Sequence, residues 1–200
     1  MSDRINQSKL SKLLIEVFRS SKKFFKNLES FNFKTTYKSD NSPLTILDKR
    51  IDSFIKVELN KFRNDFSVIS EESGQKKLDS EYVWIIDSID GTKELISGSD
   101  EFTINIALIQ NKLPIFGGIY QPLKDTIFLG GSDLSPIKIK GTKTLALKNQ
   151  EKELCNIVIS KSHSSDRERE FHRRVLSNFG QSKILKMGSS LKFCSICDGK

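Results

Sequence analysis

Apolar residues recur at helical spacing along the first part of the chain, with lysines between them. Residues 3–28 carry leucines, a valine and phenylalanines at intervals of three and four, which predicts one long amphipathic helix. A second apolar stripe covers residues 47–62. Pro43 precedes it and is expected to lie at the start of the helix. Thr45 and Asp48 match a capping box, so a second helix is predicted to begin here.

The middle of the chain changes to short apolar runs and alternating patterns. Residues 66–70 and 82–86 predict two strands, and the second is expected to be buried on both faces. Residues 102–109 alternate between apolar and polar side chains. Residues 113–120 follow after a turn at residues 111–112, so a hairpin is predicted.

The last third of the chain contains further short elements after a looser region. Residues 126–129 predict a strand, and residues 132–153 are expected to be loosely organised and to divide the chain. Later elements are predicted as a strand at 155–160, a helix at 164–178, a strand at 183–187 and a helix after residue 190. This order predicts an α+β fold of layered helices and sheets.

Composition and charge narrow the class of protein. The 200 residues are 36% hydrophobic and 29% charged, as in an ordinary soluble globular protein. The net charge of +8 allows an anionic partner, but the lysines are scattered and form no aromatic-basic cluster. Nucleic-acid binding is therefore not expected.

No apolar run approaches the roughly 20 residues of a membrane helix. The N-terminus also lacks the core of a secretory signal, so the cytoplasm is expected.

The three cysteines, Cys155, Cys194 and Cys197, make an odd number, which favours a reducing compartment. The last two have CxxC spacing, but no second pair of Cys or His residues lies nearby, so a zinc site is not expected. We expect buried, apolar thiols on a helix.

Acidic residues gather at the ends of two predicted strands. Glu71 and its neighbour Glu72 follow the strand at 66–70, and Asp87 and Asp90 follow the apolar run at 82–86. If the two strands are neighbours, these carboxylates meet at one edge and repel each other. Hard divalent cations such as Mg²⁺ compensate such charge through oxygen ligands. The backbone carbonyl of Ile89 offers one more oxygen.

A phosphate group fits beside these acids. Gly91 and Thr92 begin a short predicted helix at residues 91–97, where free amides favour a phosphate and glycine permits its close approach. Carboxylates that bind metal beside a phosphate suggest phosphoester hydrolysis. A purely structural interpretation stays open, because acids in turns are common local caps and Asp48 is explained by its capping box.

The compound pattern resembles a known family. Glu71-Glu72 followed by residues 84–92, WIIDSIDGT, is similar to the signature of the inositol monophosphatase superfamily of Mg²⁺-dependent, lithium-sensitive phosphatases. The stretches DGTKEL, EFTINIALI, SKSH and GSSLKFC, at residues 90–95, 101–109, 160–163 and 188–194, resemble its CysQ branch, the 3'(2'),5'-bisphosphate nucleotidases. The similarity runs from about residue 42 to the last residue.

The resemblance implies a fold and a set of site residues. The fold would be a layered αβαβα sandwich with an incomplete C-terminal part. Residues 1–134 would carry the metal and phosphate site, and residues 135–200 would contribute nucleotide contacts. The metal ligands, for two or more Mg²⁺ ions, would be Glu71, Asp87, the carbonyl of Ile89 and Asp90. Catalysis would use Asp48, Glu71 and Thr92, and substrate would contact Asp90, Gly91, Thr92, His163, Ser189 and Lys192.

The implied reaction removes the 3'-phosphate of adenosine 3',5'-bisphosphate to give AMP, in sulfur assimilation, by attack of water without a covalent intermediate. An inositol or sugar phosphate is the alternative substrate. Two departures from the family pattern are visible: Ser88 replaces a usual proline, and a C-terminal Trp-Asp motif is missing, because Trp84 is the single tryptophan. The chain is therefore expected to be truncated, and an inactive remnant or a protein that binds anionic ligands stays an alternative. Oligomeric state and peripheral association with the inner membrane are left open.

Overall fold

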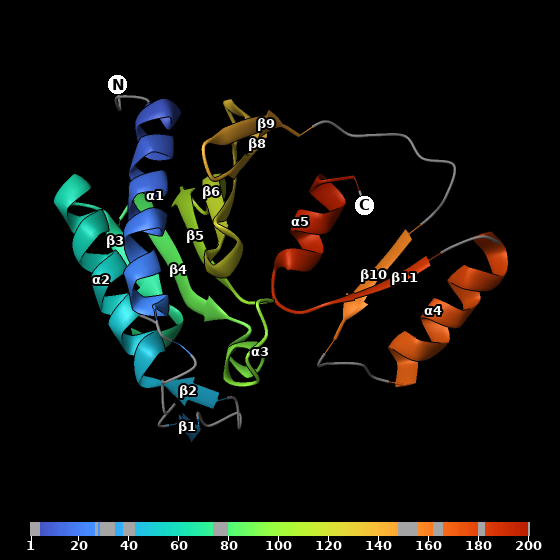
Figure 1. The fold of residues 1–200 in the computed structure, drawn as a ribbon. Coiled ribbons are helices and arrows are strands. Elements are labelled where there is room, and N and C mark those ends of the chain that lie inside the picture. The colour runs from blue at the N-terminus through green and yellow to red at the C-terminus, as the bar shows by residue number, and fades with distance from the viewer. Residues whose placement is uncertain are drawn as a thin grey trace.

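The protein is described by a computed structural model that covers residues 5–26, 28, 35–37, 43–73, 80–147, 156–161, 166–179 and 183–199. Figure 1 shows elements stacked in layers. Helices α1 (Gln7–Ser21) and α2 (Ile46–Phe62) cover one face of a seven-stranded sheet, and helix α5 (Leu191–Cys197) lies on the other side, followed by a two-stranded sheet and helix α4 (Asp166–Phe179). This is the predicted layered α+β architecture. No helix in the described part of the chain is long and apolar enough to cross a membrane.

The first helix is shorter than the sequence predicts. Helix α1, Gln7–Ser21, begins after Asn6, whose side chain accepts hydrogen bonds from two backbone amides. A 3₁₀ turn, η1 (Lys22–Phe25), then replaces the predicted continuation to residue 28. The tighter turn sends neighbouring rings in different directions: Phe24 packs on Phe54, and Phe25 packs on Phe102. The prediction was wrong here because these tertiary contacts override helical spacing.

The second helix begins with the predicted capping box. Helix α2, Ile46–Phe62, has Thr45 as its N-cap; Thr45 Oγ1 accepts from the amides of Leu47 and Asp48, and Asp48 Oδ2 accepts from Thr45 N at 2.8 Å. Pro43 does not lie in the helix. It begins strand β2 (Pro43–Thr45), which pairs antiparallel with β1 (Thr35–Tyr37). Proline is tolerated at the first residue of a strand, because no ladder hydrogen bond is lost there.

The large sheet has the order β3-β4-β5-β6-β7-β8-β9. Only β3 and β4 pair in parallel, and each later strand pairs antiparallel with the one before it. The bounds are β3 Ser67–Ser70, β4 Tyr82–Asp90, β5 Thr103–Gln110, β6 Leu113–Gln121, β7 Thr126–Gly131, β8 Leu134–Lys140 and β9 Lys143–Ala146. Short helices η3 (Glu71–Ser73), α3 (Thr92–Ile96) and η4 (Pro122–Lys124) connect some of these strands.

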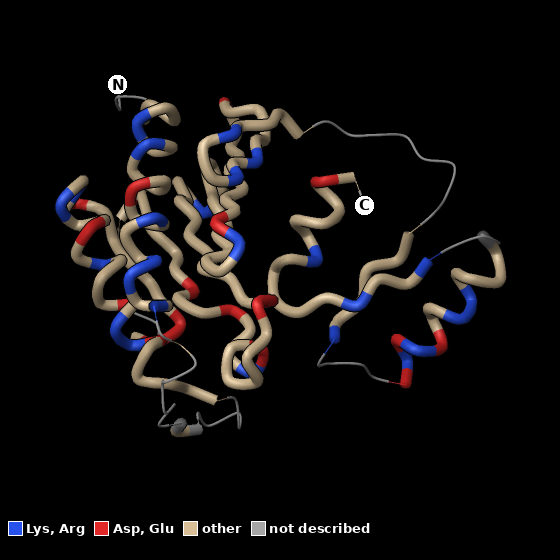
Figure 2. Tube along the Cα trace, in the orientation of Figure 1, with Lys and Arg blue, Asp and Glu red and all other residues tan. Residues whose placement is uncertain are grey.

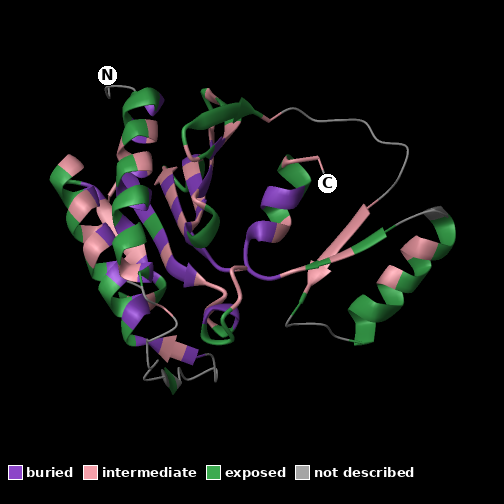
Figure 3. Cartoon of the chain, in the orientation of Figure 1, coloured by how far each residue is buried: buried purple, intermediate pink, exposed green. Residues whose placement is uncertain are grey.

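The main core lies between the sheet and helices α1 and α2 (Figure 3). The alternation predicted for residues 102–109 is confirmed on its apolar side, because Phe102, Ile104, Ile106 and Leu108 are buried, although Thr103 on the polar side is buried as well. Strand β4 was predicted to be buried on both faces, and this is wrong in part. Trp84 is fully buried, but Ile85, on the opposite face, is 43% exposed. The face of the sheet turned away from α1 and α2 is therefore incompletely covered at β4.

The region predicted to be loose continues the sheet. Strands β8 and β9 form a hairpin that extends the sheet from β7 as far as Ala146. Arg19 of α1 donates a hydrogen bond to Gly141 O at 2.6 Å in the turn between the two strands. The expectation of a loose region was therefore wrong up to Ala146. The division of the chain at residues 134 and 135 stays a prediction.

The C-terminal elements appear in the predicted order. Strands β10 (Asn156–Ser160) and β11 (Lys183–Met187) pair in parallel, with helix α4 (Asp166–Phe179) between them in sequence. Helix α5 (Leu191–Cys197) follows a turn at residues 188–190. Of the CxxC pair, Cys194 is buried as expected, but Cys197 is exposed. The two thiols do not share a buried face, and Cys155 lies outside the described residues.

Candidate active site

The candidate site lies where β4 ends. The parallel register pairs Ser70 with Ile86, so Glu71 and Asp87 come next on their two strands and reach the same edge of the sheet. Between β4 and β5, Asp87 pairs with Asn105 and Asp90 pairs with Thr103, with a register shift in between. A bulge of this kind redirects side chains and is common beside active sites. Figure 2 shows acidic positions gathered where β4, α3 and the start of β5 meet.

Gly91 allows the chain to turn sharply from β4 into α3. Its φ of +96° lies in the left-handed region that glycine adopts without steric cost. A Cβ atom at this position would lie 3.1 Å from Glu101 O and 3.3 Å from Phe102 Cα. Any other residue here would adopt a strained φ, and its Cβ would push Glu101 and Phe102, which lie just before β5, aside by a few tenths of an ångström.

Asp48 and Thr92 meet at this edge from different layers. Thr92 Oγ1 lies 3.3 Å from Asp48 Oδ1 and 3.2 Å from Ile89 O. Asp48 is 2% exposed, and this burial raises the pKa of its carboxyl, although hydrogen bonds from Thr45 and Thr92 oppose the shift. Both oxygens of Asp48 are engaged, because Thr45 Oγ1 donates to Oδ2 at 2.5 Å.

The oxygen donors at this edge suit a hard cation. Asp87, the Ile89 carbonyl and Asp90 come from one stretch of β4, and one Asp87 oxygen is buried. Carboxylate and carbonyl oxygens are the ligands that Mg²⁺ takes in proteins. Glu71 arrives on the neighbouring strand, but its side chain is exposed. No three Asp, Glu, His or Cys side chains in the described ranges lie close enough together to hold a metal ion. The donor chemistry fits Mg²⁺, while Glu71 is not gathered into a compact group with the aspartates.

The predicted substrate-binding residues of the C-terminal part lie at the start of α5. Ser189 is buried, with a φ of +52°, and its Oγ accepts a hydrogen bond from Leu191 N at 3.4 Å. Lys192 is half-buried, and its Nζ donates to Ser189 O at 2.7 Å. Lys192 thus points back to the turn that precedes α5. His163 lies outside the described residues.

The sequence interpretation missed the polar side chains of β5. Asn105 Nδ2 donates to Asp90 Oδ2 at 3.3 Å, and Ser190 Oγ donates to Asn105 Oδ1 at 2.9 Å. Thr103 Oγ1 lies 2.8 Å from Ser190 Oγ. The available signal was the alternation of β5, which placed Thr103 and Asn105 together on its polar side.

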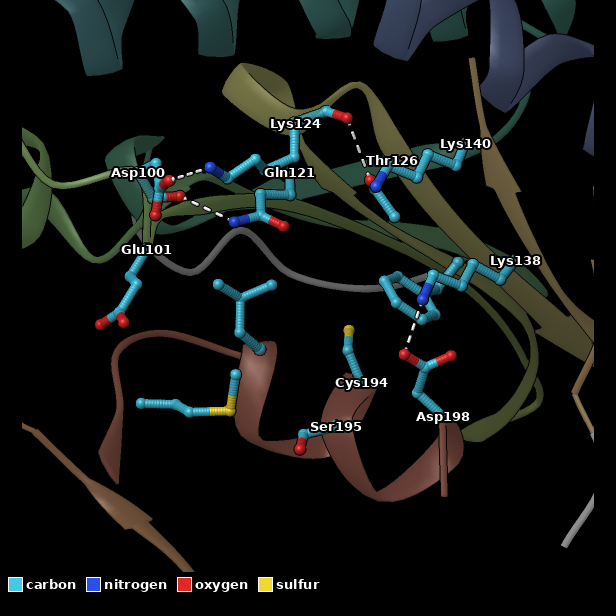
Figure 4. Close-up of a pocket in the computed structure, with 13 residues that line it drawn as sticks. Asp100, Glu101, Gln121, Lys124, Thr126, Lys138, Lys140, Cys194, Ser195 and Asp198 are labelled. Carbon is cyan, nitrogen blue, oxygen red and sulfur yellow. Dashed lines mark hydrogen bonds and ion pairs between the residues drawn. The ribbon is translucent and has the colours of Figure 1, made fainter. Parts of the chain in front are cut away.

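A cavity of about 280 Å³ lies beside the candidate site, between the sheet and α5 (Figure 4). Lys138 of β8 and Asp198, which form an ion pair of 2.6 Å, line this cavity together with Glu101. Neither Asp87 nor Asp90 lines this cavity. It is therefore separate from the carboxylate edge, although two residues that line it, Asp100 and Glu101, lie shortly before β5 in the sequence.

Comparisons with known proteins agree with the geometry. The model of the inositol monophosphatase family matches residues 6–200. The 3'(2'),5'-bisphosphate nucleotidase CysQ of Buchnera aphidicola is 35% identical over 168 residues, which cover 82% of this chain and 62% of the relative. The same-named protein of Escherichia coli K12 is 32% identical over 167 residues, covering 82% of this chain and 65% of the relative. The chain thus spans less than two thirds of the length of these curated relatives.

A solved structure supports the fold. The crystal structure of CysQ from Bacteroides thetaiotaomicron, a bacterial member of the same family, superposes with a TM-score of 0.81 at 27% sequence identity. The match covers 98% of this chain and 79% of the other. The resemblance seen in the sequence and the layered fold that it implied are both confirmed.

Proposed function

Because the chain belongs to the inositol monophosphatase family, we propose that it is a Mg²⁺-dependent phosphomonoesterase. Its substrate would be adenosine 3',5'-bisphosphate, from which it removes the 3'-phosphate to give AMP, as part of sulfur metabolism. The relatives named CysQ bisphosphate nucleotidases support this choice of substrate. The observation that carries the proposal is the joining of Asp48, Thr92 and the β4 aspartates at one sheet edge.

The cation site would use the oxygens of Asp87, Ile89 and Asp90, with Glu71 from the adjacent strand. When bound, two or more Mg²⁺ ions would offset the carboxylate charge and polarise the phosphate oxygens. Glu71 is exposed and follows directly on β3, so it can reach the sheet edge without moving the strand.

Asp48 and Thr92 would orient the attacking water. The Thr92 hydroxyl accepts a hydrogen bond from the water and directs its own proton to Asp48 Oδ1, which lies 3.3 Å away. Asp48 is held by Thr45 on its other oxygen, so its carboxylate cannot rotate freely. This fixed geometry is what general-base assistance requires. Asp48 therefore combines a structural role in the helix cap with a catalytic one.

The turn at residues 188–190 and the start of α5 would hold the far end of the nucleotide. Lys192 supplies a cation close to Ser189, and the exposed Lys161 donates to Glu101 Oε2 at 3.2 Å. A second phosphate group needs such positive charge. We assign Ser189 and Lys192 to the nucleotide and its second phosphate, together with His163.

The test is release of phosphate from adenosine 3',5'-bisphosphate with Mg²⁺, with chromatography to identify AMP as the product. The wild-type chain is compared with a Glu71→Ala, Asp87→Ala double variant, in which two proposed ligands are removed. We expect Mg²⁺-dependent release that the double variant loses. Equal release from the two proteins, or none from either, contradicts the proposal.

Inositol 1-phosphate and fructose 1,6-bisphosphate are included in the same assay, because the family also contains phosphatases of other substrates. A higher kcat/KM for either of them would replace the nucleotide as the substrate. Calorimetric titration of Mg²⁺ tests the remaining alternative: a chain that binds no Mg²⁺ but does bind adenosine 3',5'-bisphosphate would be an anion-binding protein.

The proposed location is the cytoplasm, which the odd number of cysteines supports.

A further inference from the structure

Three polar side chains, from Glu101 shortly before β5 and from Thr103 and Asn105 in it, fasten the turn at residues 188–190 to the large sheet. Gly188 N donates to Glu101 Oε2 at 3.1 Å, and Thr103 Oγ1 lies 2.8 Å from Ser190 Oγ. Ser190 Oγ donates to Asn105 Oδ1 at 2.9 Å. Residues 101, 103 and 105 lie on one face of this segment, so the same face holds the turn at Gly188 and at Ser190.

The same strand face also reaches the carboxylates of β4. Asn105 is paired in register with Asp87, and its Nδ2 donates to Asp90 Oδ2 at 3.3 Å. Its side-chain amide therefore bridges Asp90 on one side and Ser190 on the other. These two residues lie 100 positions apart in the sequence, and one side chain connects them.

The direction of these hydrogen bonds is determined by chemistry. An ionised Asp90 can only accept, so the NH₂ group of Asn105 must face it and the carbonyl oxygen must face Ser190. The one proton of the Ser190 hydroxyl then goes to Asn105, and Thr103 must donate to Ser190. The result is a one-way chain of donors, from Thr103 through Ser190 and Asn105 to Asp90, whose members polarise one another.

The turn at residues 188–190, which this series of hydrogen bonds holds, has a strained backbone at Ser189. Ser189 has a φ of +52°, a left-handed conformation that is unfavourable for a residue other than glycine and persists only where the surroundings enforce it. Thr103 and Ser190 are buried, so their hydrogen bonds do not compete with bulk water. The position of Ser189, and of Lys192 that bonds to its carbonyl, thus depends on contacts with β5.

We propose that Asn105 is a positioning residue that orients the Asp90 carboxylate for the cation and couples it to the turn at residues 188–190. This inference rests on the proposed function, which makes Asp90 a cation ligand and the turn a substrate contact. Removing Asn105 frees the Asp90 carboxylate to rotate and weakens cation binding. Coupling between two sites is reciprocal, so a substrate that orders the turn raises the affinity for the cation.

The test measures the Kd for Mg²⁺ alone by calorimetry. Asn105→Leu keeps the branched shape of the side chain in a larger volume and removes both hydrogen bonds, and we expect it to raise the Kd about 10- to 100-fold. Ser190→Ala, which removes the donor to Asn105, raises the Kd by a smaller factor. Because this effect travels through Asn105, adding Ser190→Ala to Asn105→Leu changes the Kd no further.

The matched control is Gln110→Leu on the same strand. Its amide donates to Tyr82 Oη at 2.7 Å, at the opposite end of β5, so its removal leaves the Mg²⁺ affinity unchanged. Urea unfolding followed by Trp84 fluorescence checks that each variant is folded. If Asn105→Leu does not fold, Asn105→Ser, which is smaller and too short to span the same gap, replaces it.

Two results would overturn the inference while leaving the proposed function in place. The first is an Asn105→Leu protein that binds Mg²⁺ as the wild type does. The second is a double variant in which the two effects add, as expected for independent structural damage. A wild-type chain that binds no Mg²⁺ contradicts the proposed function itself, and the inference falls with it.

Discussion

Thr92 Oγ1 lies 3.3 Å from Asp48 Oδ1, so a hydrogen bond connects the first turn of α2 to the first residue of α3 across 44 positions of sequence. Asp48 is fixed by the capping box with Thr45, and Thr92 is fixed by the sharp turn at Gly91. The two elements that form this contact are each determined locally. Their meeting is a property of the tertiary fold.

Replacement of Thr92 by Val removes the hydroxyl and keeps the shape of the side chain. The water that attacks phosphorus then loses the group that orients it, and we expect kcat for adenosine 3',5'-bisphosphate to fall about 100-fold or more. KM changes little, because the change affects the attacking water more than the bound phosphate. Thr144→Val in the exposed strand β9 is the control and retains wild-type kcat. Steady-state kinetics decides, and an unchanged kcat in Thr92→Val removes Thr92 from the catalytic residues.

Asp48→Asn is expected to lose activity without losing stability. Burial raises the pKa of Asp48 in the folded protein above that in the unfolded chain, so the folded state binds more protons between the two pKa values. The wild type therefore loses stability as pH rises through that window, and the uncharged asparagine does not. At pH 7 the free energy of unfolding of Asp48→Asn should equal or exceed that of the wild type.

Urea unfolding from pH 4 to pH 7 measures this difference. The free energy of unfolding of Asp48→Asn minus that of the wild type should increase with pH and then level off. A variant that is less stable than the wild type at pH 7 would show that the hydrogen bonds from Thr45 outweigh the burial of charge. Loss of activity is measured in the same preparations.

The elements of the site that follow local rules could be predicted from the sequence. The capping box, the short helix after Gly91 and the alternation of β5 each depend on a few neighbouring residues, and each is present in the structure. The bridge from Asp90 through Asn105 to Ser190 could not be predicted, because it needs three distant segments to meet.

The wrong predictions of secondary structure also arise because tertiary contacts decide the outcome. Helical spacing suggested that α1 continues to residue 28, but Phe25 packs against Phe102 from the start of β5 and the helix tightens instead. Strands β8 and β9 were overlooked, although Ile137 and Ile139 alternate with lysines. The pairing of β8 with β7, and of β9 with β8, places these strands in the sheet more than their own hydrophobicity does.

Gly118→Ala should destabilise the core between α1 and the sheet. A Cβ atom at Gly118 would lie 2.7 Å from Leu129 Cδ2 and 2.8 Å from Phe18 Cε2. Overpacking of this kind costs about 1–3 kcal/mol of unfolding free energy. Gly117→Ala is the matched control on the other face of β6, where the nearest atom, Ile106 O, is 3.5 Å away. Urea unfolding should separate the two variants, and equal stabilities would mean that Leu129 and Phe18 move aside without cost.

Cys194 and Cys197 should differ sharply in reactivity, although they lie on one helix. Burial, with a smaller contribution from the charge of Cys197, raises the pKa of the Cys194 thiol to about 12. At pH 8 about one Cys194 in ten thousand is then a thiolate, the reactive form. Cys197 is exposed. With Cys155 replaced by Ser, iodoacetamide should modify Cys197 first and Cys194 only in urea, as mass spectrometry can show. Modification of both at similar rates would mean that α5 separates readily from the sheet.

Ser88→Ala should stabilise the protein, although the residue lies within the candidate site. Ser88 is 1% exposed, and its Oγ has no hydrogen-bond partner among the described residues. Burying a hydroxyl without a partner costs about 1–3 kcal/mol, so its removal should raise the free energy of unfolding by about 1 kcal/mol. Ser21→Ala is the control of opposite sign, because the buried Ser21 Oγ donates to Phe18 O at 2.6 Å and its loss should be destabilising. A Ser88→Ala protein that is less stable than the wild type would show that the hydroxyl is hydrogen-bonded in solution, and that the bulge between Asp87 and Asp90 depends on that bond.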